Sequence, residues 1–128
     1  MAGGRTIHVE GFSHQNPIPS ASRVGGLVVS TIIGAVDPET KETPASLDEQ
    51  CALVFANMQR ILTSAGAKTG DIVKVVIYME DPGRQDVVNA HWVKLFPNED
   101  DRPVRHTHRE TLAGTRLIAA DFVAVVSD

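Results

Sequence analysis

The sequence is poor in the features that would tie it to a special compartment. It has one cysteine, so an intramolecular disulfide is impossible and a reducing compartment is indicated. No stretch approaches the roughly 18 apolar residues of a membrane-spanning helix, and the first residues, MAGGR, lack the apolar core of a signal peptide. These absences predict a soluble, cytoplasmic protein that does not bind membranes.

Positive charge is also scarce. Asp and Glu number 16 against 12 Lys and Arg, the formal net charge is −4, and no basic block occurs. Nucleic-acid-binding surfaces are normally strongly basic, so nucleic acid is not an expected partner. The 128 residues, 42% hydrophobic and 22% charged, are instead typical of one globular domain over residues 1–128.

Two amphipathic segments predict helices. The first begins after Ser46, whose spacing from Glu49 fits a capping box, and ends near Gly66, which favours a left-handed cap. The second covers about residues 85–95 and is stopped by Pro97. The apolar stripe of the first helix repeats every three or four positions and comprises Leu47, Cys51, Val54, Phe55, Met58, Ile61 and Leu62.

Six segments predict strands, because they are short, rich in β-branched residues and bounded by turn residues. They lie at 5–10, on both sides of Gly25-Gly26 within 23–33, and at 71–79, 103–112 and 117–126. The order β-β-β-α-β-α-β-β predicts an α+β fold, a mixed six-stranded sheet with two helices packed on one face. The other face then needs a cover, and further copies of the chain in a closed cyclic assembly are the expected one.

The segment RPVRHTH, residues 102–108, places charged and imidazole side chains on alternating positions of a predicted strand. Because alternate side chains share a face, Arg105 and Thr107 are expected to point one way and His106 and His108 the other. Two histidines at this spacing can bind a metal, but no further strong ligand is evident on another element. We therefore predict no metal site.

Asp121 is the only charge in the apolar run from 117 to 125. An ionised carboxylate in such a strand needs a partner or a solvated cavity. If the last two strands pair through the turn at 113–115, Arg105 would lie near Asp121. The two would then form a plain ion pair, or Arg105 would bind a ligand carboxylate while Asp121 positions a water. The residue pattern alone leaves both alternatives open.

Motifs along nearly the whole chain, from about Ile7 to Val126, resemble those of the RidA/YjgF family of reactive-intermediate deaminases. The AGA…DIVK segment and the R-P-x-R-x-T pattern are specific in combination. The matching segments are VDPET at 36–40, NMQRILTSAGAKTGDIVKVVIYMED at 57–81, DVVNAHWVKLFP at 86–97, RPVRHT at 102–107 and the apolar last strand.

The resemblance implies a chorismate-mutase-like fold and a homotrimer with clefts at its subunit interfaces. It implies hydrolysis of small 2-imino or enamino acids to 2-oxoacids and ammonia, with no metal and no organic cofactor. The family's carboxylate-binding arginine falls on Arg105, and its water-orienting glutamate falls on Asp121, which is shorter by one methylene. Thr107 and Asn89 match family positions beside the substrate.

Two departures from the family pattern alter the expected pocket. Ile18 stands where the family has a tyrosine, and Ile32, after Thr31, stands where it has a glycine that lies close to the ligand. Both changes make the pocket more aliphatic. They favour a substrate larger than 2-iminopropanoate, such as an aminomuconate-type compound in a catabolic step.

Two other functions compete with deamination. The first is a non-catalytic trimer that binds small carboxylates or acts as an interaction module, which the shortened Asp121 and the missing tyrosine favour. The second is an endoribonuclease, a label that members of the family have carried. The net charge of −4 argues against RNA binding.

Overall fold

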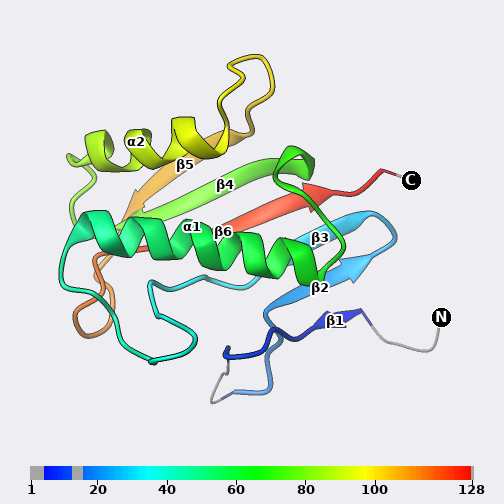
Figure 1. Cartoon of the computed structure of the whole chain (residues 1–128), viewed down its shortest axis with the longest axis horizontal. Coiled ribbons are helices and arrows are strands. Elements are labelled where there is room, and N and C mark those ends of the chain that lie inside the picture. The colour runs from blue at the N-terminus through cyan, green and yellow to red at the C-terminus, as the bar shows by residue number, and fades with distance from the viewer. Residues whose placement is uncertain (1–4, 13–15, 128) are drawn as a thin grey trace.

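The computed structural model describes residues 5–12 and 16–127 and confirms the predicted α+β fold and element order. Two helices lie across a six-stranded sheet (Figure 1). A short 3-10 turn at Thr69–Asp71 connects the first helix to the fourth strand. The elements are β1 (Thr6–Ile7), β2 (Ala21–Val24), β3 (Leu27–Ser30), α1 (Leu47–Ser64), β4 (Ile72–Met79), α2 (Gln85–Leu95), β5 (Val104–Arg109) and β6 (Ile118–Val125).

The sheet has the strand order β1-β2-β3-β6-β4-β5, with β5 at one edge. Strands β4 and β5 are parallel, and all other neighbours are antiparallel. The expected pairing of the last two strands is therefore wrong, because β4 lies between β5 and β6. Helix α2 is the crossover between β4 and β5, and it returns the chain so that β5 runs parallel to β4. Strand β6 then pairs with the other edge of β4.

The helix cap and the glycine turns predicted from the sequence are present in the structure. Ser46 caps α1 by accepting a hydrogen bond from the Glu49 backbone N–H at 3.1 Å, and its hydroxyl donates to Glu49 Oε1 at 3.0 Å. Gly66 follows the helix with a φ of +77°, and Gly25 turns the β2–β3 hairpin with a φ of +58°. Both values favour glycine over any other residue.

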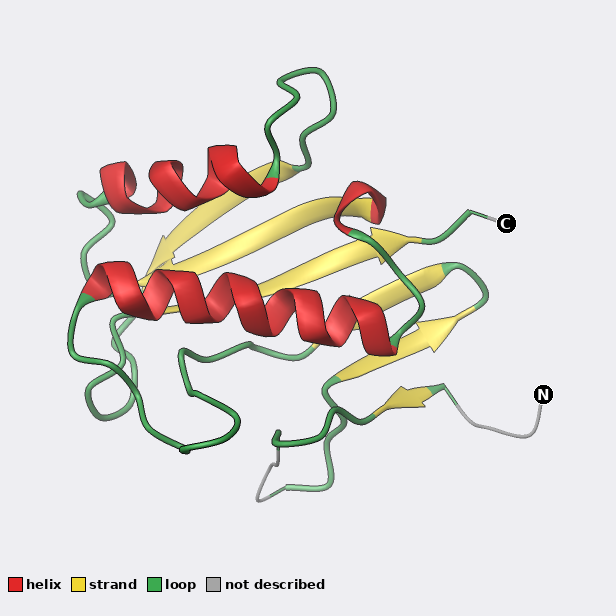
Figure 2. Ribbon diagram, viewed as in Figure 1, coloured by secondary structure: helices red, strands yellow, loops and turns green. Residues whose placement is uncertain are grey.

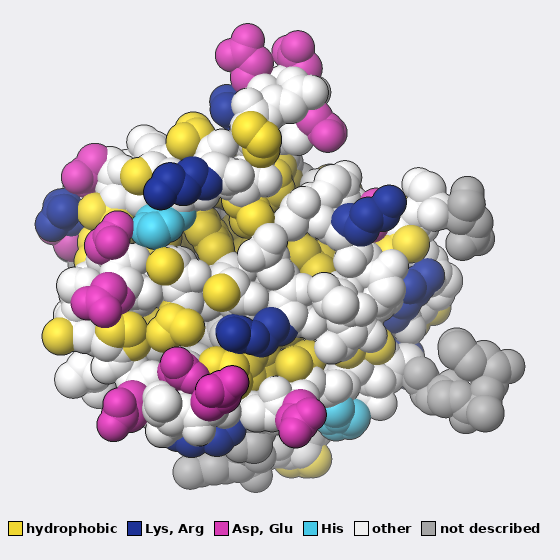
Figure 3. All heavy atoms as spheres, in the orientation of Figure 1, with side chains coloured by type: hydrophobic (Ala, Val, Ile, Leu, Met, Phe, Trp, Pro, Cys, Tyr) yellow, Lys and Arg dark blue, Asp and Glu magenta, His cyan; other side chains and the backbone are white. Residues whose placement is uncertain are grey.

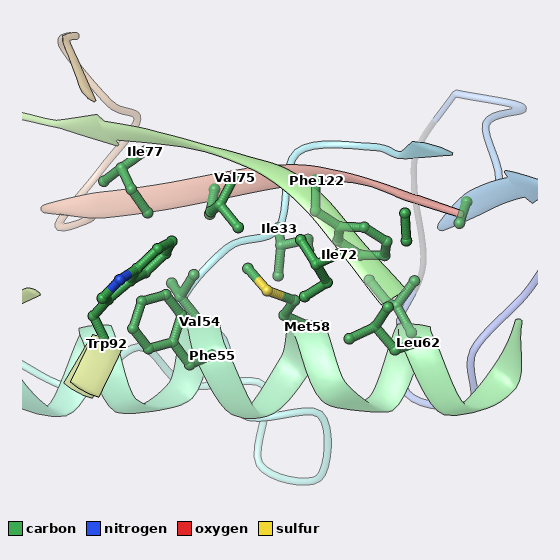
Figure 4. Packing of buried hydrophobic residues seen from close by; sticks show 14 of the residues in the cluster. Ile33, Val54, Phe55, Met58, Leu62, Ile72, Val75, Ile77, Trp92 and Phe122 are labelled. Carbon is green, nitrogen blue, oxygen red and sulfur yellow. The ribbon is translucent and has the colours of Figure 1, made fainter. Parts of the chain in front are cut away.

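The core lies between the helices and one face of the sheet (Figure 2). Met58 and Leu62 point from α1 toward Val75 and Phe122 on the central strands, and all four are buried (Figure 4). Truncating a buried residue of this size to alanine typically costs about 2–5 kcal/mol. This face therefore supplies much of the stability that fixes the site.

Two buried amides on α1 hold loops against the core. Asn57 donates to the backbone carbonyls of Gly34 and Val36, both at 2.9 Å. Gln50 donates to the Thr115 carbonyl at 3.0 Å. They therefore fix the segment after β3 and the segment before β6.

The opposite face of the sheet is not covered by either helix, as predicted. It exposes large apolar side chains, which monomeric proteins rarely gather on one surface. None of the described helices is both long enough and apolar enough to cross a membrane. The exposed apolar residues of this open face are Val24, Leu27, Val29, Val104 and Val125.

Candidate functional site

Arg105 lies on the edge strand β5 and faces the helices. It is in register with Val75, which is fully buried on that face. Its Nη2 donates to Asn89 Oδ1 at 2.7 Å and to Gln85 Oε1 at 3.0 Å, both on α2. The guanidinium is therefore held by the helix that covers its strand.

The Arg105 guanidinium has no acidic partner in the part of the chain that the structure describes. Neither the ion pair of Arg84 with Asp86 nor the contact of His91 with Asp48 includes Arg105. Its Cζ lies 4.9 Å from the centre of the Trp92 ring, and burial lowers the pKa of the guanidinium. A half-buried cation with free N–H groups is suited to bind a carboxylate in a bidentate manner.

Thr107 lies two residues along on the same face, in register with Ile77, and is half-buried. His106 and His108 are exposed on the other face, as the alternation predicts. The order of side chains on β5 thus matches the sequence analysis.

Asp121 is on the open face, opposite to Arg105. It is in register with Val76, and Val76 is in register with His106. Its Oδ2 accepts a hydrogen bond from the Tyr78 hydroxyl at 2.8 Å. The expectation that Asp121 needs a partner is confirmed, but the partner is a phenol. The expected closeness of Arg105 and Asp121 is absent within one chain, because the two last strands do not pair.

Tyr78 lies between the acid and a histidine. Its ring stacks on His108 with centroids 5.7 Å apart. Burial, and after it the hydrogen bond to Asp121, raises the pKa of Tyr78 to about 12. The hydroxyl therefore stays protonated at neutral pH and remains a donor to the carboxylate.

Two of the predicted pocket residues, Thr31 and Ile32, directly follow β3. Thr31 and Ile32 line a cavity of about 440 Å³ whose wall also includes Lys41 and Arg116. Neither Arg105 nor Asp121 lines it. One chain thus does not bring all the predicted site residues together.

Two of these residues are strongly exposed. Ile18 is 47% exposed and Ile32 is 56% exposed. An isolated antiparallel bridge joins Ile33 to Ala120, so Ile32 and Asp121 each adjoin a residue of this bridge.

Among the described residues, the remaining sulfur and imidazole groups do not form a second reactive centre. Cys51 is fully buried, as predicted, and burial raises the pKa of its thiol to about 12. A protonated thiol is a poor nucleophile. Within residues 5–12 and 16–127, no three His, Cys, Asp or Glu side chains are arranged to hold a metal ion.

Sequence reasoning missed Gln85 and Tyr78. Gln85 precedes Asn89 by one helical turn, so its position on the same face of α2 was available as a signal. Tyr78 had no such signal, because its contact with Asp121 depends on which strand lies beside β4.

The surface on the helix side carries charges of both signs. Lys and Arg side chains are separated from one another by acidic and uncharged surface (Figure 3). RNA-binding faces are instead continuous in positive charge. This side of the molecule lacks such a face.

Comparisons with known proteins agree with the resemblance. The family model described as Endoribonuclease L-PSP matches residues 12–116. A RutC family protein of Aquifex aeolicus is 35% identical over 92 residues, which are 71% of this chain and 73% of that protein. The 2-iminobutanoate/2-iminopropanoate deaminase of Escherichia coli K12 is 32% identical over 73 residues, 57% of each chain.

The fold agrees as well. The crystal structure of the YjgF gene product of E. coli superposes with a TM-score of 0.86 at 26% identity, covering 95% of this chain and 98% of that one. The sequence motifs, the family model and the shared architecture are consistent with one another. The chain belongs to the RidA/YjgF family.

Proposed function

We propose that the chain hydrolyses 2-imino and enamino acids to 2-oxoacids and ammonia, with Arg105 binding the substrate carboxylate. In this reaction R–C(=NH)–COO⁻ and one water give R–CO–COO⁻ and NH3. The observation that carries the proposal is the half-buried Arg105 guanidinium, which has amide partners but no acidic partner in the described chain. The E. coli relative named for 2-imino acids supports the reaction class.

In the proposed mechanism, Arg105 fixes the carboxylate and withdraws electron density from the adjacent C=N carbon. A water oriented by Asp121 attacks that carbon, and the resulting carbinolamine collapses and releases ammonia. The backbone at Thr107 and the side chain of Asn89 border the carboxylate. A positioned water with one proton acceptor typically contributes about 10²–10⁴ in rate.

We propose further that Arg105 and Asp121 of neighbouring subunits meet in one cleft. Within one chain they lie on opposite faces of the sheet, so the same reaction needs residues of two copies. A contact between two different surfaces of successive copies closes into a ring, and a homotrimer is such a ring. The exposed apolar side chains of the open face supply surface for this contact to bury.

Two aliphatic side chains carry the proposal on substrate size. Ile32 adjoins the bridge that joins Ile33 to Ala120, the residue before Asp121, and we propose that Ile32 and Ile18 contact the substrate side chain together with Thr31. These contacts favour an imino acid larger than 2-iminopropanoate, with aminomuconate-type compounds as one class. The non-catalytic carboxylate-binding module is the second candidate, since Arg105 is held in place without any residue of a partner.

The test is ammonia release from imines made in place by an amino-acid oxidase, from alanine as a small parent and leucine as a bulky one. We expect acceleration by the wild type and a loss of about 100-fold or more in Arg105→Ala, because charge-assisted hydrogen bonds are lost. Arg109→Ala is the matched control, since Arg109 is exposed on the same face of β5 and its Nη1 donates to the Glu80 carbonyl. We expect this control to keep its activity.

Two results would count against the proposal. No acceleration over buffer with either imine rejects deamination of these substrates and favours the carboxylate-binding module. If Arg105→Ala and Arg109→Ala lose the same fraction of activity, the loss comes from a general disturbance of β5 and not from a missing carboxylate contact.

A further inference from the structure

The guanidinium of Arg105 is held by two uncharged acceptors on one nitrogen. Gln85 Oε1 and Asn89 Oδ1 both accept from Nη2, at 3.0 Å and 2.7 Å. The two amides are four residues apart on α2 and therefore share a helix face. Both hydrogen bonds restrain the same edge of the guanidinium.

The amide of Gln85 is itself fixed. Its Nε2 donates to the Pro82 carbonyl at 3.0 Å and lies 3.7 Å from Met79 Sδ. With the nitrogen bound to this turn, the oxygen is the atom that faces Arg105. The orientation is also the only chemically sensible one, because arginine donates hydrogen bonds and accepts none.

Trp92 lies against one surface of the guanidinium. The Arg105 Cζ lies 4.9 Å from the ring centre, within the range of a cation–π contact. With Nη2 bound to the amides and one surface near the indole, Nη1 and Nε have no partner among the described residues. They are the donors available to a carboxylate.

We infer that Gln85 is a positioning residue that orients Arg105 without neutralising it, and so sets the affinity for the substrate carboxylate. The inference rests on the proposed role of Arg105 and concerns the same site. A glutamate at this position would reach the same Nη2 but would also supply a counter-charge. Because the Gln85 amide is uncharged, the positive charge of Arg105 is not neutralised and remains available to attract the ligand carboxylate.

The test compares Gln85→Glu with Gln85→Met, which is neutral and similar in length but cannot accept the hydrogen bond. The probe is 2-oxobutanoate, the stable product of 2-iminobutanoate hydrolysis, and its dissociation constant is measured by calorimetry. Thermal unfolding is followed in parallel. Gln59→Glu, which adds the same charge at an exposed site on α1, is the matched control.

We expect Gln85→Glu to weaken 2-oxobutanoate binding at least about tenfold, because a like charge next to a bound anion is strongly unfavourable. Gln85→Met should weaken it about threefold through lost orientation, within the ordinary effect of one hydrogen bond. Gln59→Glu should bind as the wild type does. In turnover, KM should rise in Gln85→Glu while kcat changes little, which a loss of folded protein would not produce.

Several results would overturn the inference. Wild-type affinity in Gln85→Glu, or equal losses in the Glu and Met variants, would show that the neutrality of Gln85 has no role. If Gln85→Glu does not fold, an unchanged affinity in Gln85→Met is sufficient to overturn the inference. A wild-type protein that does not bind 2-oxobutanoate also overturns it. Because binding is measured without turnover, a protein that binds through Gln85 and Arg105 but releases no ammonia refutes the proposed function and not this inference.

Discussion

The two faces of the sheet each hold one unusual charge, and they hold it in similar ways. On the helix face, Arg105 is bound by the amide oxygens of Gln85 and Asn89. On the open face, Asp121 is bound by the hydroxyl of Tyr78. In both places the partner is uncharged, although an ion pair would have been the simpler way to stabilise a half-buried charge.

The two faces differ in what covers them. Helix α2 lies over the edge strand, so the hydrogen-bond partners of Arg105 come from its own chain (Figure 1). Neither of the two described helices lies over the open face, where exposed apolar residues lie on β3, beside the strand of Asp121. In the proposed function, carboxylate binding therefore needs the residues of one chain, whereas the chemistry needs those of two.

The strongest test of this comparison separates binding from chemistry. In Asp121→Asn we expect kcat to fall about 10²–10⁴-fold, because the acceptor that orients water is lost. The dissociation constant of 2-oxobutanoate should stay that of the wild type, since Arg105 is untouched. If Asp121→Asn loses carboxylate binding as Arg105→Ala does, the two faces do not act separately.

Mixing the two inactive variants tests whether the half-sites come from different subunits. Arg105→Ala and Asp121→Asn chains are unfolded together and refolded as mixed oligomers, and ammonia release is measured. In a ring with one shared site per interface, about a quarter of the sites receive both intact residues, so about a quarter of wild-type activity should return. Each variant refolded alone is the control. Activity that stays at the level of the controls would mean that both residues act from one chain.

A smaller effect is expected from Tyr78→Phe, which removes the neutral partner of the acid. The loss of one hydrogen bond should lower kcat about three- to tenfold and leave carboxylate binding intact. Arg109→Ala again serves as a control for changes on the neighbouring strand. A kcat equal to that of the wild type would show that Tyr78 has no role in the reaction.

The same residue makes stability depend on pH in the alkaline range. The pKa of Tyr78 is raised from 10.0 to about 12 in the folded protein, so the unfolded chain loses this proton first as pH rises. The free energy of unfolding should therefore have its full Tyr78 contribution below pH 10 and lose it between about pH 10 and pH 12. Tyr78 is the only tyrosine, so tyrosinate absorbance follows it directly. A midpoint at 10 would contradict the hydrogen bond between Tyr78 and Asp121.

The smallest effect concerns the interior of the helix face. The pKa of Cys51 is raised from 9.0 to about 12, mainly by burial and then by Asp48. We expect a thiol reagent at pH 8 to label this single cysteine only as fast as the protein unfolds. The labelling rate is compared with that in denaturant. Rapid labelling of the native protein would show that this face is open to solvent.

Local structure was predictable from the sequence because its causes are local. The cap at Ser46, the turn at Gly25-Gly26 and the limits of α2 were found where the residues indicated. The alternation on β5 also assigned Arg105 and His106 to opposite faces correctly. The family resemblance, which the comparisons confirm, fixed the architecture.

The arrangement of strands was not predictable in the same way. Whether β6 lies beside β5 or beside β4 depends on long-range packing, and that choice decides which residue meets Asp121. Tyr78 as its partner was therefore missed, and the closeness of Arg105 to Asp121 was wrongly expected. The buried amides of Gln50 and Asn57 were missed because they interrupt the apolar pattern of α1 only at its margin.

Trp92 is the only tryptophan of the chain, and its ring lies beside the Arg105 guanidinium. The intrinsic fluorescence of the protein therefore arises from a single indole at the proposed carboxylate site. A ligand that draws the cation toward itself alters the electric field on that indole, and so the emission intensity or wavelength. Occupancy of this half-site can thus be followed optically in the unlabelled protein, separately from any reaction at the other face.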